Sequence, residues 1–252
     1  MPTPIKFMGT RLALAGKAEV LALIDAGGPA RIATPNPEFM LEAQENPAFR
    51  SALEGMDCCI VDGSGLYFGL RLQQLLRGGN NAPGQYAGAD LCADLFARYR
   101  DGSRSFYLLG GKDGLAAAAV PRILAIYPGV KIVGAEGGGL IGRDGTTVDA
   151  SLSIRIKAAK PNILLIGFGA PRQELWITQN APDLAVQVMV GVGGTFGFYT
   201  DKKRAPRLLR SLHIEWLYRG ATESGHWRRV WRATVVFGWR TASWLLSHSD
   251  QS

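Results

Sequence analysis

Aspartate and threonine residues follow two short apolar segments, a position where residues that carry chemistry are often found. Asp62 directly follows the apolar run Cys58–Val61, and Thr34 follows another such run. An aspartate in this position either caps the next helix or acts as a general base that accepts a proton in a cleft. Thr34 precedes Asn36 and Pro37, a pair typical of a helix start. A helix start explains that pair but gives no reason for the threonine.

Glycine-rich segments could bring backbone N–H groups close to a phosphate, because glycine allows close approach at a turn between a strand and a helix. The segments are Gly63-Ser64-Gly65, Gly110-Gly111-Lys112, Gly167-Phe168-Gly169 and Gly193-Gly194. The lysine of the second segment could also meet a phosphate. None of them has the full spacing of a P-loop or of a dinucleotide fingerprint, so ATPase chemistry and a nicotinamide site are poorly supported.

Three polar residues, Arg172, Gln173 and Glu174, fall in the first turn of a helix that Pro171 is expected to begin. A glutamate suits the positive end of the helix dipole, which accounts for Glu174 without any function. An arginine opposes the dipole. Arg172 therefore suggests an anionic ligand, although a solvated surface position explains it equally well.

Several kinds of site are poorly supported. The three histidines, His213, His226 and His248, all lie near the C-terminus, so the rest of the chain offers neither a Ser-His-Asp set nor a zinc-binding HExxH motif. No Asp-x-Asp pair occurs, so the acidic clamp that holds Mg²⁺ on a nucleotide sugar is missing, and no metal or cofactor is expected. Cys58 and Cys59 are predicted to be buried strand residues in a reducing compartment.

Short apolar runs alternate with helical patterns over residues 1–195. The runs are Arg31–Ala33, Cys58–Val61, Phe106–Leu109, Val130–Val133, Ile163–Ile166 and Val186–Val190. This alternation predicts an α/β fold, with a mostly parallel sheet that carries helices on both faces. Ligands of such sheets bind at the carboxyl ends of the strands, which is where the segments described above fall.

The charge of the 252-residue chain is unevenly distributed. The formal net charge is +7, but residues 1–195 hold 18 basic and 17 acidic side chains, and residues 196–252 hold 10 and 4. Five of the six tryptophans also lie in the second part. We therefore predict a near-neutral catalytic body, residues 1–195, and a basic, Trp-rich helical appendage, residues 196–252. Basic and aromatic residues do not extend over the body, so a nucleic-acid partner is not expected.

The appendage has the composition of a segment that docks on a membrane surface. Trp227, Val230 and Trp231 recur at helical spacing, with Arg228 and Arg232 predicted on the other side, as suits an anionic lipid surface. The alternative is a helix packed on the body with its tryptophans in the core. The N-terminus lacks the pattern of a signal peptide, and no apolar run is long enough to span a bilayer.

Six ordered motifs together resemble the WecG/TagA/CpsF glycosyltransferases over nearly the whole chain. They are Thr34-Pro35-Asn36-Pro37-Glu38-Phe39, Asp62-Gly63-x-Gly65-Leu66, Gly110-Gly111-Lys112, Gly167-x-Gly169-Ala170-Pro171-Arg172-Gln173-Glu174-x-Trp176, Gly191-Val192-Gly193-Gly194, and Lys203-Arg204-Ala205-Pro206 with Glu215-Trp216-Leu217-Tyr218-Arg219. The resemblance implies a Rossmann-like, metal-independent transferase that uses a nucleotide sugar. Its acceptor would be a sugar on undecaprenyl pyrophosphate at the cytoplasmic face of a bacterial membrane, in cell-envelope polysaccharide or exopolysaccharide synthesis. The enzyme would be peripheral, with the appendage docked on the membrane and covering the active site.

The resemblance also implies roles for individual residues. Asp62 would be the general base, Thr34 a second catalytic residue, Gln173 a substrate-binding residue, and Arg219 a cation that neutralises the leaving diphosphate. With the glycine turns, the residues expected to bind substrate are Asn36, Gly63, Gly65, Gly110, Lys112, Gly167, Gly169, Arg172, Gln173, Gly193, Gly194, Arg219 and Arg229.

The chain departs from the family pattern in several places. Gln85 and Gly197 stand where the family has Arg and Asp, Gly137-Gly138-Gly139-Leu140 replaces an aromatic loop, and Glu223-Ser224-Gly225-His226 replaces a Glu-Pro-x-Arg-like segment. Arg228 or Arg229 could supply the missing cation. These departures leave open the donor, which in the family is often UDP-N-acetylmannosamine. They also leave open a membrane adaptor that keeps the fold without catalysis, whereas a nicotinamide oxidoreductase is a more distant alternative. A homo-oligomer is also left open.

Overall fold

The computed structural model of the chain describes residues 2–78, 82–111, 114–200, 206, 209 and 230–247. Its centre is a six-stranded sheet in which every pairing is parallel. In spatial order the strands are β4 (Cys58–Cys59), β3 (Ala30–Ala33), β8 (Val188–Gly191), β7 (Ile163–Gly167), β5 (Ser105–Gly110) and β6 (Lys131–Glu136). Each of the six apolar runs supplies one strand, so the predicted α/β sheet is confirmed.

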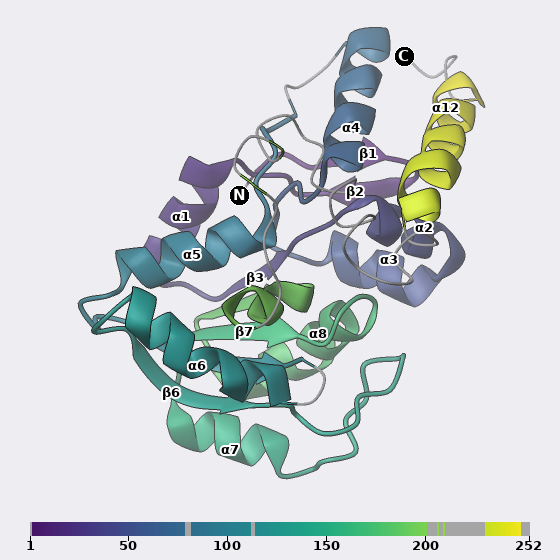
Figure 1. Ribbon diagram of the computed structural model, residues 1–252. Helices are drawn as coiled ribbons and strands as arrows, with labels where there is room; N and C mark the ends of the chain where they lie inside the picture. Colours follow the sequence, from purple (N-terminus) through teal and green to yellow (C-terminus); the bar gives the residue numbers. More distant parts are fainter. Residues whose placement is uncertain are drawn as a thin grey trace.

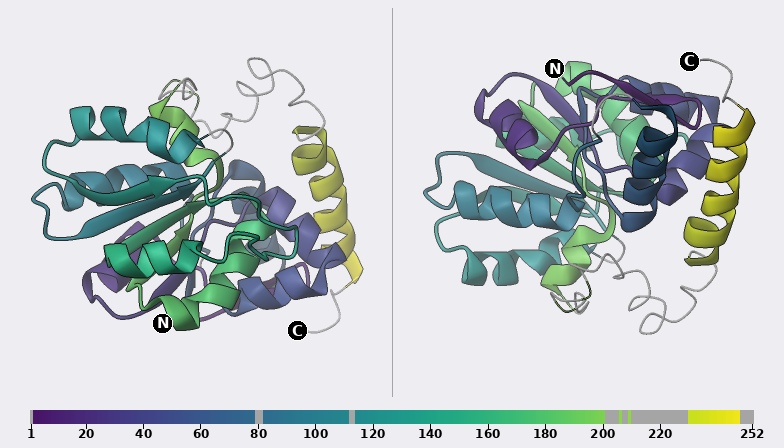
Figure 2. Two further views of the ribbon diagram at one scale, coloured as in Figure 1. Left: turned by 90° about the horizontal axis from the view of Figure 1, so that it is seen from below. Right: turned by 90° about the horizontal axis from the view of Figure 1, so that it is seen from above.

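Helices cover both faces of the sheet, because side chains along each strand alternate between two buried clusters. On β5, Phe106 and Leu108 enter one cluster, whereas Tyr107 and Leu109 enter the other. The first cluster lies under α1 (Lys17–Asp25), α5 (Gly88–Arg98), α6 (Leu115–Ile126) and the 3₁₀ helix η2 (Gly193–Tyr199). The second lies under α2 (Pro37–Glu45), α3 (Pro47–Glu54), α7 (Leu152–Ala159) and α8 (Arg172–Leu184). Figure 1 and Figure 2 show the sheet between these layers.

The start of α2 follows the predicted capping pattern. The Asn36 side-chain oxygen accepts hydrogen bonds from the backbone N–H groups of Glu38 (2.9 Å) and Phe39 (3.2 Å), and Pro37 occupies the first helical position. Such a cap satisfies donors that have no partner inside the helix. The cap therefore fixes where the chain turns after β3.

A two-stranded antiparallel sheet near the N-terminus was not predicted. It consists of β1 (Ile5–Phe7) and β2 (Thr10–Leu12), joined through Met8 and Gly9. Both joining residues have positive φ, as in the type I′ turns that connect two-residue hairpins. The usual sequence signal for such a turn is Asn-Gly or Asp-Gly, and a methionine in the first position hides it.

The described C-terminal residues form η3 (Arg232–Val236), a π-helical segment, and α12 (Phe237–Ser247), which packs beside α4 (Ser64–Arg77) (Figure 1, Figure 2). The Phe237 ring is buried and lies 6.2 Å from the Phe7 ring. The Thr241 hydroxyl contacts the Met8 sulfur at 3.4 Å. This helix is therefore anchored on the body through the β1–β2 hairpin.

The side chains of this segment do not divide as the helical spacing predicts. Val230 is buried, whereas Trp231 and Val235 are exposed, as is Arg232. Of the described tryptophans in this segment, Trp244 packs against Phe7 (ring centroids 5.8 Å apart), and Trp239 is exposed. Trp244 thus packs on the body, as the alternative expects, whereas docking of the exposed tryptophans on a membrane stays a prediction. In the described part of the chain, no helix is long and apolar enough to cross a membrane.

Candidate functional site

The carboxyl ends of the six parallel strands lie at one edge of the sheet, and the loops that leave this edge are bonded to their neighbours. The Asp62 N–H donates to the Pro35 carbonyl (2.9 Å), which joins the loops after β4 and β3. The Thr34 hydroxyl donates to the Gly191 carbonyl (2.9 Å), which joins β3 to β8. Both candidate catalytic residues thus lie on adjacent loops at the edge where ligands of parallel sheets bind.

Glycine backbone forms the middle of this edge. A Cβ added to Gly110 would lie 2.8 Å from the carbonyl carbon of Gly167, and a Cβ added to Gly167 would lie 2.8 Å from the carbonyl oxygen of Gly193. The Gly111 N–H also donates to the Gly167 carbonyl (3.0 Å). A side chain at Gly110 or Gly167 would collide with neighbouring backbone, so the ends of β5 and β7 and the turn after β8 approach closely because these two residues are glycines. We call Gly110, Gly167 and Gly193 the glycine floor.

Asp62 lies immediately before α4 and is half-buried. The N-cap position of that helix belongs to Gly63, which has a φ of +89° and carries no side chain. Asp62 therefore lies one residue before the N-cap, and its role as a general base stays a prediction. Gly65 follows in the first turn of α4, where an added Cβ would lie 2.7 Å from the Cγ of Pro37. This close packing sets the Asp62 loop against the start of α2.

Thr34 is held firmly in place. It is 4% exposed, and a Cβ added to Gly88 at the start of α5 would lie 3.1 Å from its methyl carbon. Its hydroxyl hydrogen is directed to Gly191, so its oxygen retains lone pairs that can accept a further hydrogen bond. Asn36, two residues later, is half-buried and uses its side-chain oxygen for the α2 cap.

Gln173 connects two of the glycine turns. Its side-chain oxygen accepts hydrogen bonds from the N–H groups of Gly169 (3.1 Å) and Gly193 (3.0 Å), and its amide nitrogen donates to Glu174 (2.6 Å). The backbone amides of these two glycines therefore donate to the protein's own side chain. Gln173 is 1% exposed, so it holds the two glycine turns together from inside the fold.

The burial of Glu174 was not predicted from the sequence. The helix-dipole interpretation accounts for its place in the first turn of α8 but not for its burial, because its side chain is fully inaccessible to solvent. Burial raises the pKa of this carboxyl from 4.5 to about 8, so it is neutral at pH 7. The only sequence signal was its position directly after a glutamine in the resembling motif.

The other expected ligand residues divide into two groups. Arg172 is exposed on the first turn of α8, and positions Gly169 and Gly194 face open space, since an added Cβ would meet no atom within 4 Å. These three could meet a ligand. Lys112, Arg219 and Arg229 lie outside the described residues.

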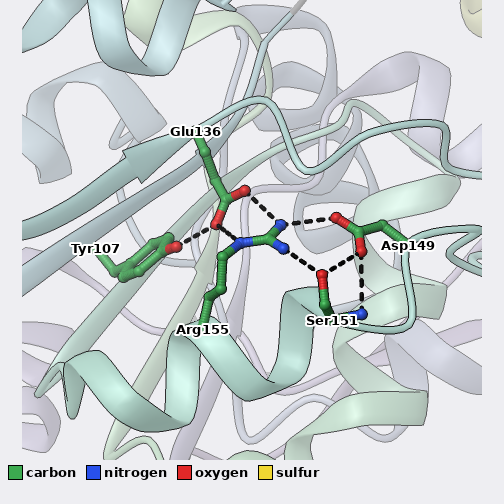
Figure 3. A network of polar contacts seen from close by, with 5 residues as sticks. All are labelled: Tyr107, Glu136, Asp149, Ser151 and Arg155. Atoms are coloured by element: carbon green, nitrogen blue, oxygen red, sulfur yellow. Dashed lines mark hydrogen bonds and ion pairs between the residues drawn. The ribbon is translucent and has the colours of Figure 1, made fainter.

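A polar network closes the far end of the site, beside β6 (Figure 3). The Arg155 guanidinium from α7 contacts the carboxylates of Glu136 (2.6 Å) and Asp149 (2.7 Å), and the Tyr107 hydroxyl donates to Glu136. Hydrogen bonds from Arg155 and Ser151 hold the pKa of Asp149 at about 2. Because Glu136 and Asp149 flank residues 137–148, Arg155 clamps both ends of the loop that replaces the family's aromatic segment.

This loop also contacts the helices next to the site. The Arg143 side chain pairs with Glu42 of α2 (3.0 Å), and Gln179 of α8 donates to the Asp144 carbonyl (2.8 Å). Leu140 and Val148, near the base of the loop, are 73% and 75% exposed. The loop is therefore anchored at its tip and its base, with an apolar outer surface.

The C-terminal segment reaches the site from the opposite side. A Cβ added to Gly65 would lie 3.3 Å from the Ala233 carbonyl of η3, so this segment touches the first turn of α4, three residues from Asp62. Together the edge offers a carboxylate, a threonine hydroxyl and a floor without side chains. Such a set can position a hydroxyl for deprotonation beside a ligand that needs close approach to backbone.

Comparison with known proteins agrees with this geometry. The model of the glycosyl transferase WecG/TagA/CpsF family matches residues 5–251. The chain belongs to this family. It is a glycosyltransferase by family, and the resemblance seen in its motifs is confirmed.

Two curated relatives of this glycosyltransferase carry the same name. An N-acetylglucosaminyldiphosphoundecaprenol N-acetyl-beta-D-mannosaminyltransferase of Bacillus spizizenii is 29% identical over 209 residues, which is 82% of this chain and 77% of the relative. A protein of the same name from Staphylococcus aureus strain NCTC 8325 is 30% identical over 207 residues, with 81% and 76% covered. These relatives place the chain among enzymes of cell-envelope polymer synthesis.

The family departures can be placed in part on the structure of this glycosyltransferase. Gly197 is buried in η2, and Gln85 lies in the segment that leads from α4 to α5. His226 lies outside the described residues. The Gly137–Gly139 run begins the loop clamped by Arg155, so this departure lies at the end of the site farthest from Asp62 in the strand order.

Proposed function

We propose that the protein transfers a sugar from a nucleotide sugar, UDP-linked, to a sugar carried on undecaprenyl pyrophosphate, with inversion at the anomeric carbon. The transferred sugar is N-acetylmannosamine or a similar hexose. The relatives' names support the acceptor and the sugar, and the observation that carries the reaction is the position of Asp62 beside Thr34 at the carboxyl edge of the sheet. The product belongs to cell-surface polysaccharide synthesis.

In this proposal Asp62 is the general base. It takes the proton of an acceptor hydroxyl, whose oxygen attacks the anomeric carbon while the bond from that carbon to the diphosphate oxygen breaks. The diphosphate leaves with the bonding electron pair. A positioned base contributes about 10²–10⁴-fold in rate. Thr34 accepts a hydrogen bond from the substrate through the lone pairs that its bond to Gly191 leaves available.

The leaving diphosphate is bound by cations at a site without bulky side chains. The glycine floor and the open faces of Gly169 and Gly194 let the diphosphate approach the backbone closely. Since the N–H groups of Gly169 and Gly193 already donate to Gln173, side-chain cations carry more of the charge. Arg172 is the exposed candidate, and Lys112, Arg219 and Arg229 are candidates beyond the described residues. The sequence lacks an Asp-x-Asp clamp, which supports transfer without a metal.

We also propose that the appendage predicted over residues 196–252 holds the catalytic body on an anionic membrane surface. Its first residues, 196–199, are an exception, because they belong to η2, and Phe196 and Tyr199 pack in the core of the body. Exposed apolar side chains on α4 and the C-terminal segment support the docking, because these helices pack side by side. They include Phe68, Leu72, Leu75, Leu76, Trp231, Val235, Trp239 and Leu246. Neither α4, η3 nor α12 contains an acidic residue, whereas Arg71, Arg232 and Arg240 lie on them. Indole rings and cations together suit the headgroup region of anionic lipid.

A transfer assay tests the catalytic proposal. A panel of UDP-sugars is offered with lipid-linked N-acetylglucosamine as acceptor, and products are identified by mass spectrometry. We expect one donor to be transferred, with Asp62→Asn about 10²–10⁴-fold slower and with unchanged UDP binding. The control is Asp183→Asn, which makes the same change at an exposed position on α8. Transfer at the wild-type rate by Asp62→Asn would remove the base from the mechanism, and UDP binding without any transfer would favour an adaptor.

A further inference from the structure

The Gln173–Glu174 pair lies against the last residue of β8. A Cβ added to Gly191 would lie 2.7 Å from the Gln173 amide nitrogen and 2.8 Å from the Glu174 Oε1. The same Gly191 accepts the Thr34 hydroxyl bond through its carbonyl oxygen. The pair is therefore packed directly beneath the point where the Thr34 loop and the β8 turn are joined.

The orientation of the Gln173 amide is fixed by its partners. Its oxygen faces two backbone N–H donors, at Gly169 and Gly193, and a flipped amide would set its own hydrogens against both of them. The amide nitrogen must then face Glu174, which accepts at 2.6 Å. Without an acceptor at residue 174, that buried nitrogen would lose this hydrogen bond.

Glu174 can accept the hydrogen bond from the Gln173 amide as a neutral carboxyl group. Its side chain is fully buried, and within the described residues its second oxygen, Oε2, has no hydrogen-bond partner. A neutral acid with one unpaired hydroxyl costs far less to bury than an unpaired carboxylate. Among the described residues, the titratable group that faces it is the thiol of Cys59 on β4, which is buried and whose pKa is raised. No opposite charge in this part of the chain therefore stabilises an ionised Glu174.

We propose that Glu174 is a positioning residue, whose neutral carboxyl orients the Gln173 amide and so sets the turns at Gly169 and Gly193 for the diphosphate of the donor. Both turns border open space, since a Cβ added to either glycine would meet no atom within 4 Å. A small displacement of such turns changes how closely a diphosphate can approach. Misplacement of about 1 Å can cost 10²-fold in rate.

Two substitutions distinguish a role of Glu174 in orienting the Gln173 amide from a role in packing alone. Glu174→Gln keeps a neutral acceptor oxygen with nearly the same shape, whereas Glu174→Leu keeps the volume but removes the acceptor. We expect kcat/KM with the UDP-sugar to fall about 10- to 100-fold in Glu174→Leu and to stay within about threefold in Glu174→Gln. We also expect wild-type activity to decline above about pH 8, because an ionised Glu174 would leave an unpaired buried charge at Oε2 and so displace the Gln173–Glu174 pair. Glu174→Gln should lack this decline.

Hydrogen–deuterium exchange provides a readout that is independent of catalysis. The predicted fall in kcat/KM rests on the proposed function, but the effect of Glu174 on the two turns does not. Exchange at the amides of Gly169 and Gly193 is therefore measured in the folded proteins without substrate. We expect exchange there about tenfold faster in Glu174→Leu and unchanged in Glu174→Gln, with β5 amides unaffected.

The outcomes are distinguishable. Equal protection in both variants, or equal loss of activity in both, would overturn the positioning role. Altered exchange in Glu174→Leu without any sugar transfer by the wild type would keep the positioning role and refute the proposed function. If Glu174→Leu does not fold, the pH profile of Glu174→Gln decides, since an alkaline decline identical to that of the wild type overturns the proposal.

Discussion

The Thr34 hydroxyl donates a hydrogen bond of 2.9 Å to the carbonyl oxygen of Gly191, a residue 157 positions later in the sequence. The bond joins the ends of the adjacent strands β3 and β8. The bond is buried, and it ties one candidate catalytic residue to the strand end that the Gln173–Glu174 pair supports from below. The hydroxyl that we propose to contact substrate thus also holds two loops of the site together. Its two tasks can be separated by substitution.

Thr34→Val, which keeps the shape and removes the hydroxyl, should lower the free energy of unfolding by about 1 kcal/mol, because the Gly191 carbonyl loses a buried hydrogen bond. It should also lower kcat. Thr34→Ser restores the hydroxyl and should recover most of both. Denaturant unfolding and the transfer assay measure the two effects, and a valine variant with wild-type stability and kcat would show that neither task matters.

Gly167→Ala should destabilise the fold, because its Cβ would lie 2.8 Å from the Gly193 carbonyl oxygen within the glycine floor. Crowding of this kind costs roughly 1–3 kcal/mol. We expect a lower unfolding midpoint in denaturant and reduced transfer. Gly28→Ala is the matched control, since a Cβ there meets no atom within 4 Å and no positive φ is required. Equal midpoints for both variants would contradict the close packing of the floor.

The free energy of unfolding should depend on pH through Glu174. The folded protein holds this proton up to about pH 8, whereas an unfolded glutamate releases it near its ordinary value of 4.5. Stability from this group is therefore complete below about pH 4.5, falls by about 1.4 kcal/mol per pH unit as pH rises, and levels off above about pH 8. Glu174→Gln should remove this part of the slope, and Glu54→Gln, at an exposed position on α3, should not. Identical slopes for wild type and Glu174→Gln would show that the carboxyl is ionised in the folded state.

Arg155→Gln should loosen the loop of residues 137–148, because Arg155 contacts the carboxylates that flank both ends. Arg143 lies inside this loop, so limited trypsin digestion reports its opening. We expect faster cleavage after Arg143 in Arg155→Gln. Arg98→Gln, which breaks the ion pair with Asp25 away from this loop, should leave that cleavage unchanged. Unchanged cleavage in Arg155→Gln would mean that the contacts at the loop tip are sufficient.

Trp231→Ser with Trp239→Ser should weaken binding to anionic vesicles, because both indoles are exposed beside arginines. Flotation with vesicles of phosphatidylglycerol and with neutral vesicles measures the effect. Leu140→Ser with Val148→Ser removes equally exposed apolar side chains from the loop near β6 and serves as the control. If both double variants float like the wild type, the C-terminal surface does not dock on lipid.

The sequence predicted the sheet well, since each of the six short apolar runs produced a strand, and the Asn36-Pro37 pair fixed the start of α2. It did not predict the β1–β2 hairpin, whose three-residue strands are too short to show a period and whose turn has methionine where asparagine is usual. Local patterns carry no information about such a turn.

The site was predicted only in part. Strand ends gave Thr34, Asp62 and the glycine segments, because parallel topology brings all carboxyl ends to one edge. Glu174 was misjudged because glutamates are almost never fully buried, and only the fold reveals that its helix turns it under the sheet. The Arg155 clamp depends on residues 136 and 149, which meet only after the loop between them has folded back.

A floor made of backbone has a consequence for how such an enzyme can diversify. Gly110, Gly167 and Gly193 present no side chains that mutation could exchange for others, and their spacing forbids adding one at Gly110 or Gly167. Changes in the sugar that is accepted must therefore arise at the rim, in the Gly137–Leu140 segment and in the loops next to Asp62. Different segments of the sequence thus determine the reaction and the choice of sugar. Substitutions can change the second without changing the first.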